Sequence, residues 1–243
     1  MKIFRCAAIL SRKAGSRLLT SQSLIENISL RENGSVRLYS TAMLVYLLIA
    51  INVIVSLIGF SRMNSPTGSH IFFFSPSEVS AGRNYEGMLL SHFSHADGTH
   101  LFFNMMTLYY FGPVVEEGLG TLGMLLVYVL AGVLSTVVVY IRHRADPEYR
   151  ALGASDSVSG ILFAAIVLLP SMSIGFLFFP FPIPAPIFAI GYILISTYLM
   201  RRGRGRTSHE AHLAGAFIGL VLAGILAPEG YGPLLLRLQS FLS

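Results

Sequence analysis

Charged side chains are scarce in this chain. They make up 12% of its 243 residues, whereas a typical soluble domain carries about 25%. Hydrophobic residues account for 53%, and the mean hydropathy is +0.66. A chain of this composition has too few charges to cover an ordinary soluble surface. The scarcity therefore excludes a typical soluble globular domain and indicates an integral membrane protein.

Cysteine is nearly absent as well, since Cys6 is the only one. A single cysteine excludes an intramolecular disulfide framework. The sequence also lacks Walker, Rossmann and CxxC motifs and shows no internal repeat. The net charge of +5 comes without an aromatic and basic platform for bases, so we attribute it to membrane topology. We expect no cofactor and no nucleic-acid partner, and we expect a lipid bilayer around the protein.

Long runs without charge predict the membrane segments, because an α-helix needs about 20 apolar residues to cross about 30 Å of hydrocarbon. The runs cover residues 38–61, 98–115, 118–141, 157–200 and 211–228. Run 157–200 is long enough for two spans, and Pro170 and the prolines within 180–186 mark the break. The sequence thus predicts an all-α, polytopic membrane protein with a bundle of six transmembrane helices.

The chain divides into three predicted parts: a basic extension over residues 1–40, a membrane domain over 41–230 and a short tail over 231–243. Residues 1–25 hold five basic residues, no acidic ones, and many Ser, Ala and Leu. That composition is typical of a mitochondrial presequence, and the sequence RLYS at 37–40 is similar to a presequence cleavage site. A basic cytoplasmic tail on a bacterial protein explains the same residues, so both interpretations stay open.

The loops do not settle the orientation in the membrane. Eight Lys and Arg residues fall on the side of the N-terminus and nine on the other. The basic segment before the first helix favours an N-terminus inside, since the first helix usually dominates.

Polar residues stand at the start of three predicted helices. These residues are His100, Ser155 and His212, and helices that alternate in direction place all three starts in one leaflet. Ser155 precedes an apolar run, where unpaired backbone N–H groups stabilise an anion. His212 is placed to accept the Ser155 proton, and His100 and Asn104 share one helix face as hydrogen-bond donors. The pattern predicts a Ser–His dyad inside the membrane.

Each of these residues also has a purely structural interpretation. Ser155 can cap a helix, and His212 and Asn104 can make packing hydrogen bonds. Gly215 and Gly219 form a small-xxx-small pattern for close helix contact. Several polar groups at one depth on three helices favour a functional site over packing alone.

Three histidines close together raise the alternative of a metal site. They are His92, His95 and His100. The first two fall in a loop with no cysteine nearby, so we expect no metal.

Four stretches of the chain resemble motifs of the rhomboid family of intramembrane serine proteases. Residues 95–104 (HADGTHLFFN) resemble its HxxxxHxxxN segment, and residues 111–120 (FGPVVEEGLG) resemble the end of its second helix. Residues 153–155 (GAS) resemble its GxS motif, and residues 212–219 (HLAGAFIG) its HxxGxxxG motif. Order and spacing agree over about residues 42–228.

The resemblance implies roles for individual residues. It makes Ser155 the nucleophile, His212 the general base, and His100 and Asn104 the oxyanion-hole donors. It implies structural support from the following residues: His95 and Glu116, which brace the loop between the first two helices, and Gly153, Gly215 and Gly219. It implies neither a third catalytic acid nor a metal.

The implied activity is that of an intramembrane serine endopeptidase that cleaves transmembrane segments of other proteins at small residues. The alternative is a catalytically inactive rhomboid-like protein that binds membrane clients. A small-solute transporter is a poor fit, because no acidic residue lies at mid-membrane and no repeat is present. The substrate, its pathway and the oligomeric state have no signature in the sequence.

The chain departs from the family at two positions. Asp156 stands where the family usually has Gly, and Ser159 stands where some members have an aromatic residue. We expect Asp156 to face water and cap its helix. We also expect residues 72–74 (FFF) to lie in the membrane interface. The prolines of 180–186 and the basic loop 201–206 resemble bacterial members, which slightly favours a bacterial cell membrane over the mitochondrial inner membrane.

Overall fold

The computed structural model describes residues 42–62, 70–176, 179–202 and 208–242. They all belong to one compact unit, Leu38–Ser243. Three features of the sequence lie outside the described residues: the extension 1–40 with its presequence hypothesis, Cys6, and part of the basic loop 201–206.

The predicted membrane bundle is confirmed as a mostly helical structure. Its long apolar helices are α2 (Met43–Arg62), α5 (Gly98–His143), α6 (Ser155–Leu168), α7 (Ala185–Arg202) and α8 (His209–Leu226). By length and composition α2, α5 and α8 can cross a membrane, and α6 and α7 are shorter apolar helices. Many large apolar side chains of these helices are exposed, such as Ile54, Leu122 and Ile195. Such a surface is suited to lipid, so the protein is an integral membrane protein.

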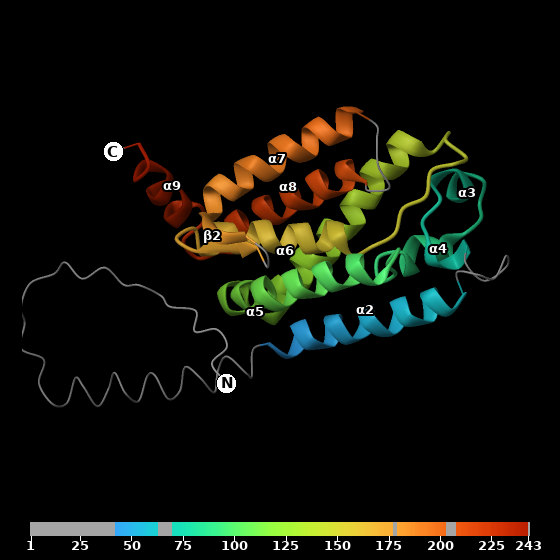
Figure 1. The fold of residues 1–243 in the computed structure, drawn as a ribbon, viewed down its shortest axis with the longest axis horizontal. Helices are drawn as coiled ribbons and strands as arrows, with labels where there is room; N and C mark the ends of the chain where they lie inside the picture. The colour runs from blue at the N-terminus through green and yellow to red at the C-terminus, as the bar shows by residue number, and fades with distance from the viewer. Residues whose placement is uncertain (1–41, 63–69, 177–178, 203–207, 243) are drawn as a thin grey trace, which may run out of the picture. The chain divides into compact units, whose positions relative to one another are not determined.

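Helix α5 contains two arms that meet at a sharp kink. Gly120 adopts φ 73° and ψ 168° there, a conformation that glycine reaches without strain. A Cβ on Gly112 would lie 3.4 Å from Cε of Met124, although twelve residues of straight helix would separate the two by about 18 Å. The second arm therefore folds back on the first (Figure 1). With the arms counted separately, the described residues contain the six apolar helical segments that the charge-free runs predict.

Helix α6 forms the centre of the bundle. All its residues from Asp156 to Val167 are buried, and it lies between α5 and α8 (Figure 1). Small residues make this central position possible, because Gly160 contacts Ala131 of α5 and the backbone of Gly215 of α8. The helix that begins at Ser155 is thus shielded along its length and open only at its ends.

A β-hairpin replaces the simple break predicted between α6 and α7. Strand β1 (Ser173–Phe176) pairs antiparallel with β2 (Phe179–Pro184), with Ser173 opposite Pro184 and Ile174 opposite Ile183. Helix α6 ends at Leu168, two residues before Pro170, which lacks an N–H and fixes φ. An extended proline-rich strand still accepts hydrogen bonds from a neighbour, which explains the hairpin.

Short helices cover one end of the bundle between α2 and α5. They are the 3₁₀ helix η1 (His70–Phe72), α3 (Pro76–Ser80) and α4 (Tyr85–Leu90), while α9 (Gly232–Gln239) follows α8. Phe72 and Phe74 are buried, and Phe74 forms a β-bridge with Ala151 through hydrogen bonds of 2.7 and 3.0 Å. The expectation that residues 72–74 lie in the membrane interface stays a prediction, but these two side chains do not face lipid. They pack inside the protein and hold the chain just ahead of Ser155.

Candidate active site

Ser155 and His212 meet at the starts of two neighbouring helices. Ser155 is the first residue of α6, and His212 lies in the first turn of α8. The distance from His212 Nε2 to Ser155 Oγ is 2.6 Å. At this distance the serine hydroxyl donates to an unprotonated ring nitrogen, which is the contact that a nucleophile and its base need.

The four predicted catalytic side chains line one cavity. Its volume is about 600 Å³, within the range of ligand-binding pockets. Its walls include His100, Asn104, Ser155 and His212. Residues from α5, α6, α7 and α8 and from the loops beside them all contribute to the lining. The structure thus brings together the helix starts that the sequence places in one leaflet.

Gly153 allows His100 to lie against the turn that carries Ser155. Its φ is +124°, and a Cβ at this position would lie 2.6 Å from Cε1 of His100 and 3.1 Å from its Nε2. The Gly153 N–H donates to the Ser91 carbonyl at 2.9 Å. A larger residue would be strained and would displace the imidazole.

Asn104 is buried on the cavity wall one helical turn after His100. Its Nδ2 donates to the His100 carbonyl at 3.1 Å. A side-chain amide has two N–H donors, so the second can point to an oxyanion in the cavity.

His95 connects the loop before α5 to α2. Its Nδ1 lies 2.8 Å from Ser56 Oγ, and its ring meets that of His100 edge to face at a centroid distance of 5.1 Å. Burial, together with the nearby His100, lowers the pKa of His95 to about 4. His95 is therefore neutral at pH 7 and suited to a supporting hydrogen bond.

Glu116 contacts the kink of α5. It is 2% exposed, and its Oε1 accepts from Thr121 Oγ1 at 2.9 Å across Gly120. Its Oε2 has no hydrogen-bond partner among the described residues. The sequence prediction had this residue brace the loop between the first two helices. The hydrogen bond from Thr121 instead stabilises the turn between the two arms of α5, because the second arm begins beside it.

Gly215 and Gly219 press α8 onto α6. A Cβ on Gly215 would overlap the backbone of Asp156, and a Cβ on Gly219 would overlap that of Gly160. This close backbone approach carries His212 to within hydrogen-bond distance of Ser155.

Asp156 does not face water, so the expectation for this residue is wrong. It is 6% exposed, its Oδ1 accepts the Ser157 N–H at 2.8 Å, and its Oδ2 lies 3.7 Å from Nδ1 of His92. The loop before α5 covers this end of α6, which explains the burial. No group of three or more His, Cys, Asp or Glu in the described part of the chain is arranged to hold a metal ion.

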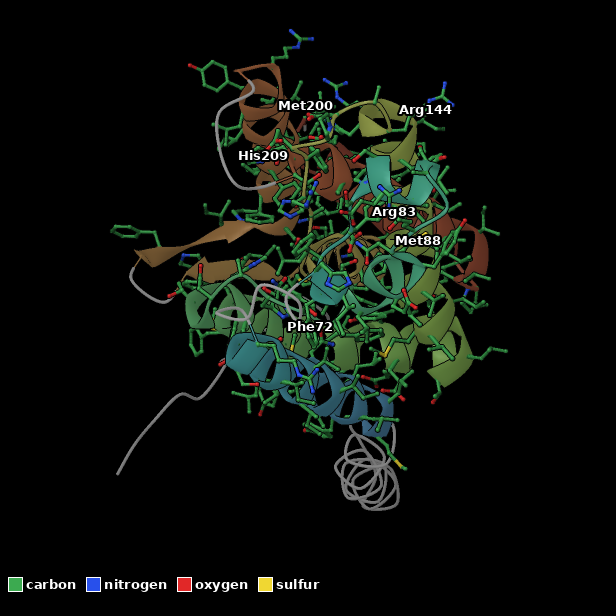
Figure 2. The ribbon with its side chains drawn as sticks, turned by 90° about the vertical axis from the view of Figure 1, so that its right-hand side faces the viewer. Phe72, Arg83, Met88, Arg144, Met200 and His209 are labelled. Carbon is green, nitrogen blue, oxygen red and sulfur yellow. The ribbon has the colours of Figure 1, made fainter. Side chains whose placement is uncertain are left out.

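A second polar cluster, missed by the sequence prediction, connects the two loops beside the dyad. His143 Nε2 lies 2.6 Å from Glu210 Oε1, and the Tyr149 ring stacks on His143 at 3.7 Å. The Tyr149 hydroxyl also donates to Ser208 Oγ at 2.7 Å. The cluster joins the end of α5, the loop before Ser155 and the start of α8. Arg144 and His209 mark this end of the molecule in Figure 2.

An aromatic side chain also reaches the cavity from α7. Tyr192 lines it, and its hydroxyl lies 2.8 Å from Ser159 Oγ. Ser159 stands where some rhomboids have an aromatic residue, so a different helix supplies an aromatic group near that place.

The chain is similar to known proteins of one family. The model of the Rhomboid domain matches residues 83–229. "RHOMBOID-like protein 12, mitochondrial" of Arabidopsis thaliana is 32% identical over 168 residues, which cover 62% of this chain and 48% of the relative. "Presenilin-associated rhomboid-like protein, mitochondrial" of Bos taurus is 35% identical over 135 residues, or 55% of this chain and 36% of the relative. "Rhomboid-related protein 4" of Homo sapiens is 32% identical over 149 residues, which cover 57% of this chain and 45% of the relative.

This chain spans less than half the length of these relatives. The Rhomboid match nevertheless covers more than half of the chain and contains α5, α6, α7 and α8, which carry the Ser155–His212 contact and its cavity. The chain belongs to the rhomboid family.

Proposed function

We propose that this protein is a serine endopeptidase that cleaves transmembrane segments of other membrane proteins through a Ser155–His212 dyad. The observation that carries the proposal is the 2.6 Å contact between Ser155 Oγ and His212 Nε2 on the wall of a cavity among apolar helices. Family membership supports the same reaction class, since rhomboids are in general intramembrane serine proteases.

The chemistry follows from the two side chains. Ser155 Oγ attacks the scissile carbonyl carbon while its proton passes to His212 Nε2, which gives a tetrahedral intermediate with a negative oxygen. His212 then returns the proton to the leaving amine, and the C–N bond breaks. Water, activated by the same imidazole, hydrolyses the acyl-enzyme and frees Ser155.

The negative oxygen needs donors that are in place before the reaction. The His100 imidazole, the second N–H of Asn104 and the backbone N–H groups at the start of α6 all border the cavity. Each such donor contributes about 10²–10³ in rate.

The substrate class follows from the surroundings of the dyad. The cavity opens among helices whose outer surfaces are apolar, so a substrate that reaches it from the bilayer is itself a transmembrane segment. The resemblance to the family implies cleavage next to small residues, where a helix unwinds most readily.

One observation favours the alternative of an inactive, client-binding protein. Asp156 places a buried carboxylate directly after the nucleophile, where an unpaired charge would repel the oxyanion. Client binding without cleavage is the outcome that this alternative predicts.

The proposal also includes the cellular membrane in which the protein resides. Two of the relatives carry "mitochondrial" in their names, which conflicts with the slight preference for a bacterial membrane. We therefore assign the protein to the mitochondrial inner membrane, with residues 1–39 as a presequence.

An activity-based probe tests the nucleophile. A fluorophosphonate or isocoumarin should label the purified wild-type protein, and peptide mass spectrometry should locate the adduct on Ser155. Ser155→Ala and His212→Ala should lose the label, while Ser171→Ala, at an exposed serine beyond α6, should keep it. An unlabelled wild type, or an adduct on Ser157 or Ser159, contradicts the proposal.

A further inference from the structure

His92 is fixed between the loop before α5, the second arm of α5 and the start of α6. Its Nδ1 lies 3.7 Å from Asp156 Oδ2, and its Nε2 lies 2.8 Å from Thr136 Oγ1. Both ring nitrogens therefore have partners, although His92 itself matches no position of the family motifs quoted above.

Each ring nitrogen of His92 faces an oxygen that can accept a proton. The single hydroxyl proton of Thr136 goes to the Gly132 carbonyl at 3.1 Å, so the Thr136 oxygen accepts from an N–H on His92 Nε2. The other nitrogen, Nδ1, faces a carboxylate oxygen, which is an acceptor. The 3.7 Å between Nδ1 and Oδ2 is too long for a hydrogen bond but within ion-pair distance, so a protonated His92 and the Asp156 carboxylate form an ion pair of opposite charges.

Asp156 lies at the start of α6, where the backbone N–H groups are proposed to bind the oxyanion. Its Oδ1 accepts the N–H of Ser157 in the first turn of α6. A carboxylate at this place adds a negative charge where the reaction develops another. Buried and unpaired, such a charge is strongly unfavourable.

The neighbouring arm of α5 leaves room for the pair. A Cβ on Gly132 would lie 2.5 Å from Ser157 Oγ and 3.2 Å from Nδ1 of His92. The absence of a side chain at Gly132 thus lets His92 approach Asp156, and Thr136 lies one turn further along the same arm.

We propose that His92 compensates the charge of Asp156, so that a carboxylate next to Ser155 is compatible with oxyanion formation and turnover falls when His92 loses its proton. The inference rests on the proposed function and adds a pH-dependent element to it. His92 acts here as a positioning residue with an electrostatic role, since it touches Asp156 and not the reacting atoms.

The direction of the pH effect follows from the pair. Burial by itself lowers the pKa of His92, but the adjacent Asp156 carboxylate outweighs burial and raises that pKa above its ordinary value. As the pH rises through this pKa, His92 becomes neutral and no longer compensates the Asp156 carboxylate, so the rate should fall on the alkaline side. His212 instead has to lose its proton to act as a base, so its titration limits the rate on the acidic side. Among the residues that the structure describes, the other titratable or charged groups that line the cavity or interact with Asp156 are Asp97, His100, Tyr128, Arg150, Tyr192 and His212.

Turnover of a transmembrane substrate, measured against pH in four proteins, tests the pair: wild type, His92→Gln, Asp156→Asn and the double variant. His92→Gln should lower kcat by about tenfold at neutral pH, the effect of one uncompensated nearby charge, with KM changed by less than about twofold. Adding Asp156→Asn to His92→Gln should restore most of kcat, and the alkaline decline should vanish. His70→Gln, at an exposed histidine in η1, is the control and should match wild type.

Three outcomes would overturn the inference. They are a wild-type kcat in His92→Gln, a kcat of the double variant as low as that of His92→Gln alone, and an alkaline decline in kcat that persists in Asp156→Asn. Loss of kcat in Asp156→Asn alone would show that the carboxylate assists His212 and would also overturn it.

Thermal unfolding against pH gives a readout that needs no activity. A group whose pKa is raised in the folded state contributes stability that is lost as the pH rises through that pKa. Wild type should show this loss, and Asp156→Asn should not. If wild type neither cleaves nor takes up the probe, the proposed function fails and the compensating role fails with it, whatever the unfolding profile. Normal cleavage without the variant pattern would overturn the inference alone.

Discussion

At the scale of single residues, Gly153 has the strictest requirement in the site. Two independent observations demand glycine: a φ of +124° and the His100 ring 2.6 Å from where a Cβ would stand. The first is a backbone requirement, and the second fixes the position of His100, the proposed oxyanion donor. The GxS pattern therefore has a local physical cause in this protein.

We predict that Gly153→Ala lowers kcat by about 10²-fold, the loss expected when one oxyanion donor is displaced. Substrate KM should change little, because the apolar walls of the cavity stay in place. Steady-state cleavage rates measure the effect, and thermal unfolding shows whether the fold survives. A variant within about twofold of wild type in kcat would mean that His100 does not depend on this turn.

Asp156 shows where residue-level prediction fails. Its sequence context, a loop with several charges, favours exposure to water, yet the side chain is buried beside His92. The cause is a contact between positions far apart in the chain, and no local pattern around Asp156 indicates that the loop before α5 covers it. By contrast, the contact between Ser155 and His212 was predictable, because each residue stands at the start of an apolar run.

At the scale of elements, the packing of α8 on α6 sets the distance between Ser155 and His212. Gly219 lies against the Gly160 backbone too closely for any Cβ. The pair Gly215 and Gly219 was visible in the sequence as a small-xxx-small pattern, but the partner helix was not.

Gly219→Val should push α8 away from α6, because the new side chain meets rigid backbone. Overpacking of this kind destabilises by about 1–3 kcal/mol, so the unfolding temperature in detergent and the rate of Ser155 labelling should both fall. Gly191→Val on α7 is the matched control, since nothing lies within 4 Å of its Cβ position. Equal behaviour of the two variants would show that the α6–α8 contact does not limit the site.

Element boundaries were predicted with uneven success. The charge-free runs correspond to helices, and the run 157–200 does break where its prolines lie. The β1–β2 hairpin in that break was not predicted, because its pairing has an irregular register between Ile174 and Phe176 and rests on a proline-rich strand without alternation. The kink at Gly120 was anticipated only as a gap between two runs.

At the scale of the whole molecule, alternation of helix direction brings the polar helix starts to one end. The described residues confirm the bundle, and one cavity contains the starts of α5, α6 and α8. The cluster of His143, Tyr149 and Glu210 lies at the same end and joins segments 67 positions apart. Such long-range contacts depend on the folded arrangement, so the sequence offered no signal for them.

The central claim is that this arrangement cleaves transmembrane segments, and proteoliposomes test it most directly. Purified full-length protein is reconstituted with a single-pass substrate that has small residues in its membrane segment, and the products are measured by mass spectrometry. We predict two fragments with a new terminus in or beside the membrane segment, and no cleavage by Ser155→Ala, His212→Ala or the double variant, which act as one unit. A substrate that binds but stays intact with wild type, or one that Ser155→Ala still cleaves, would contradict the account.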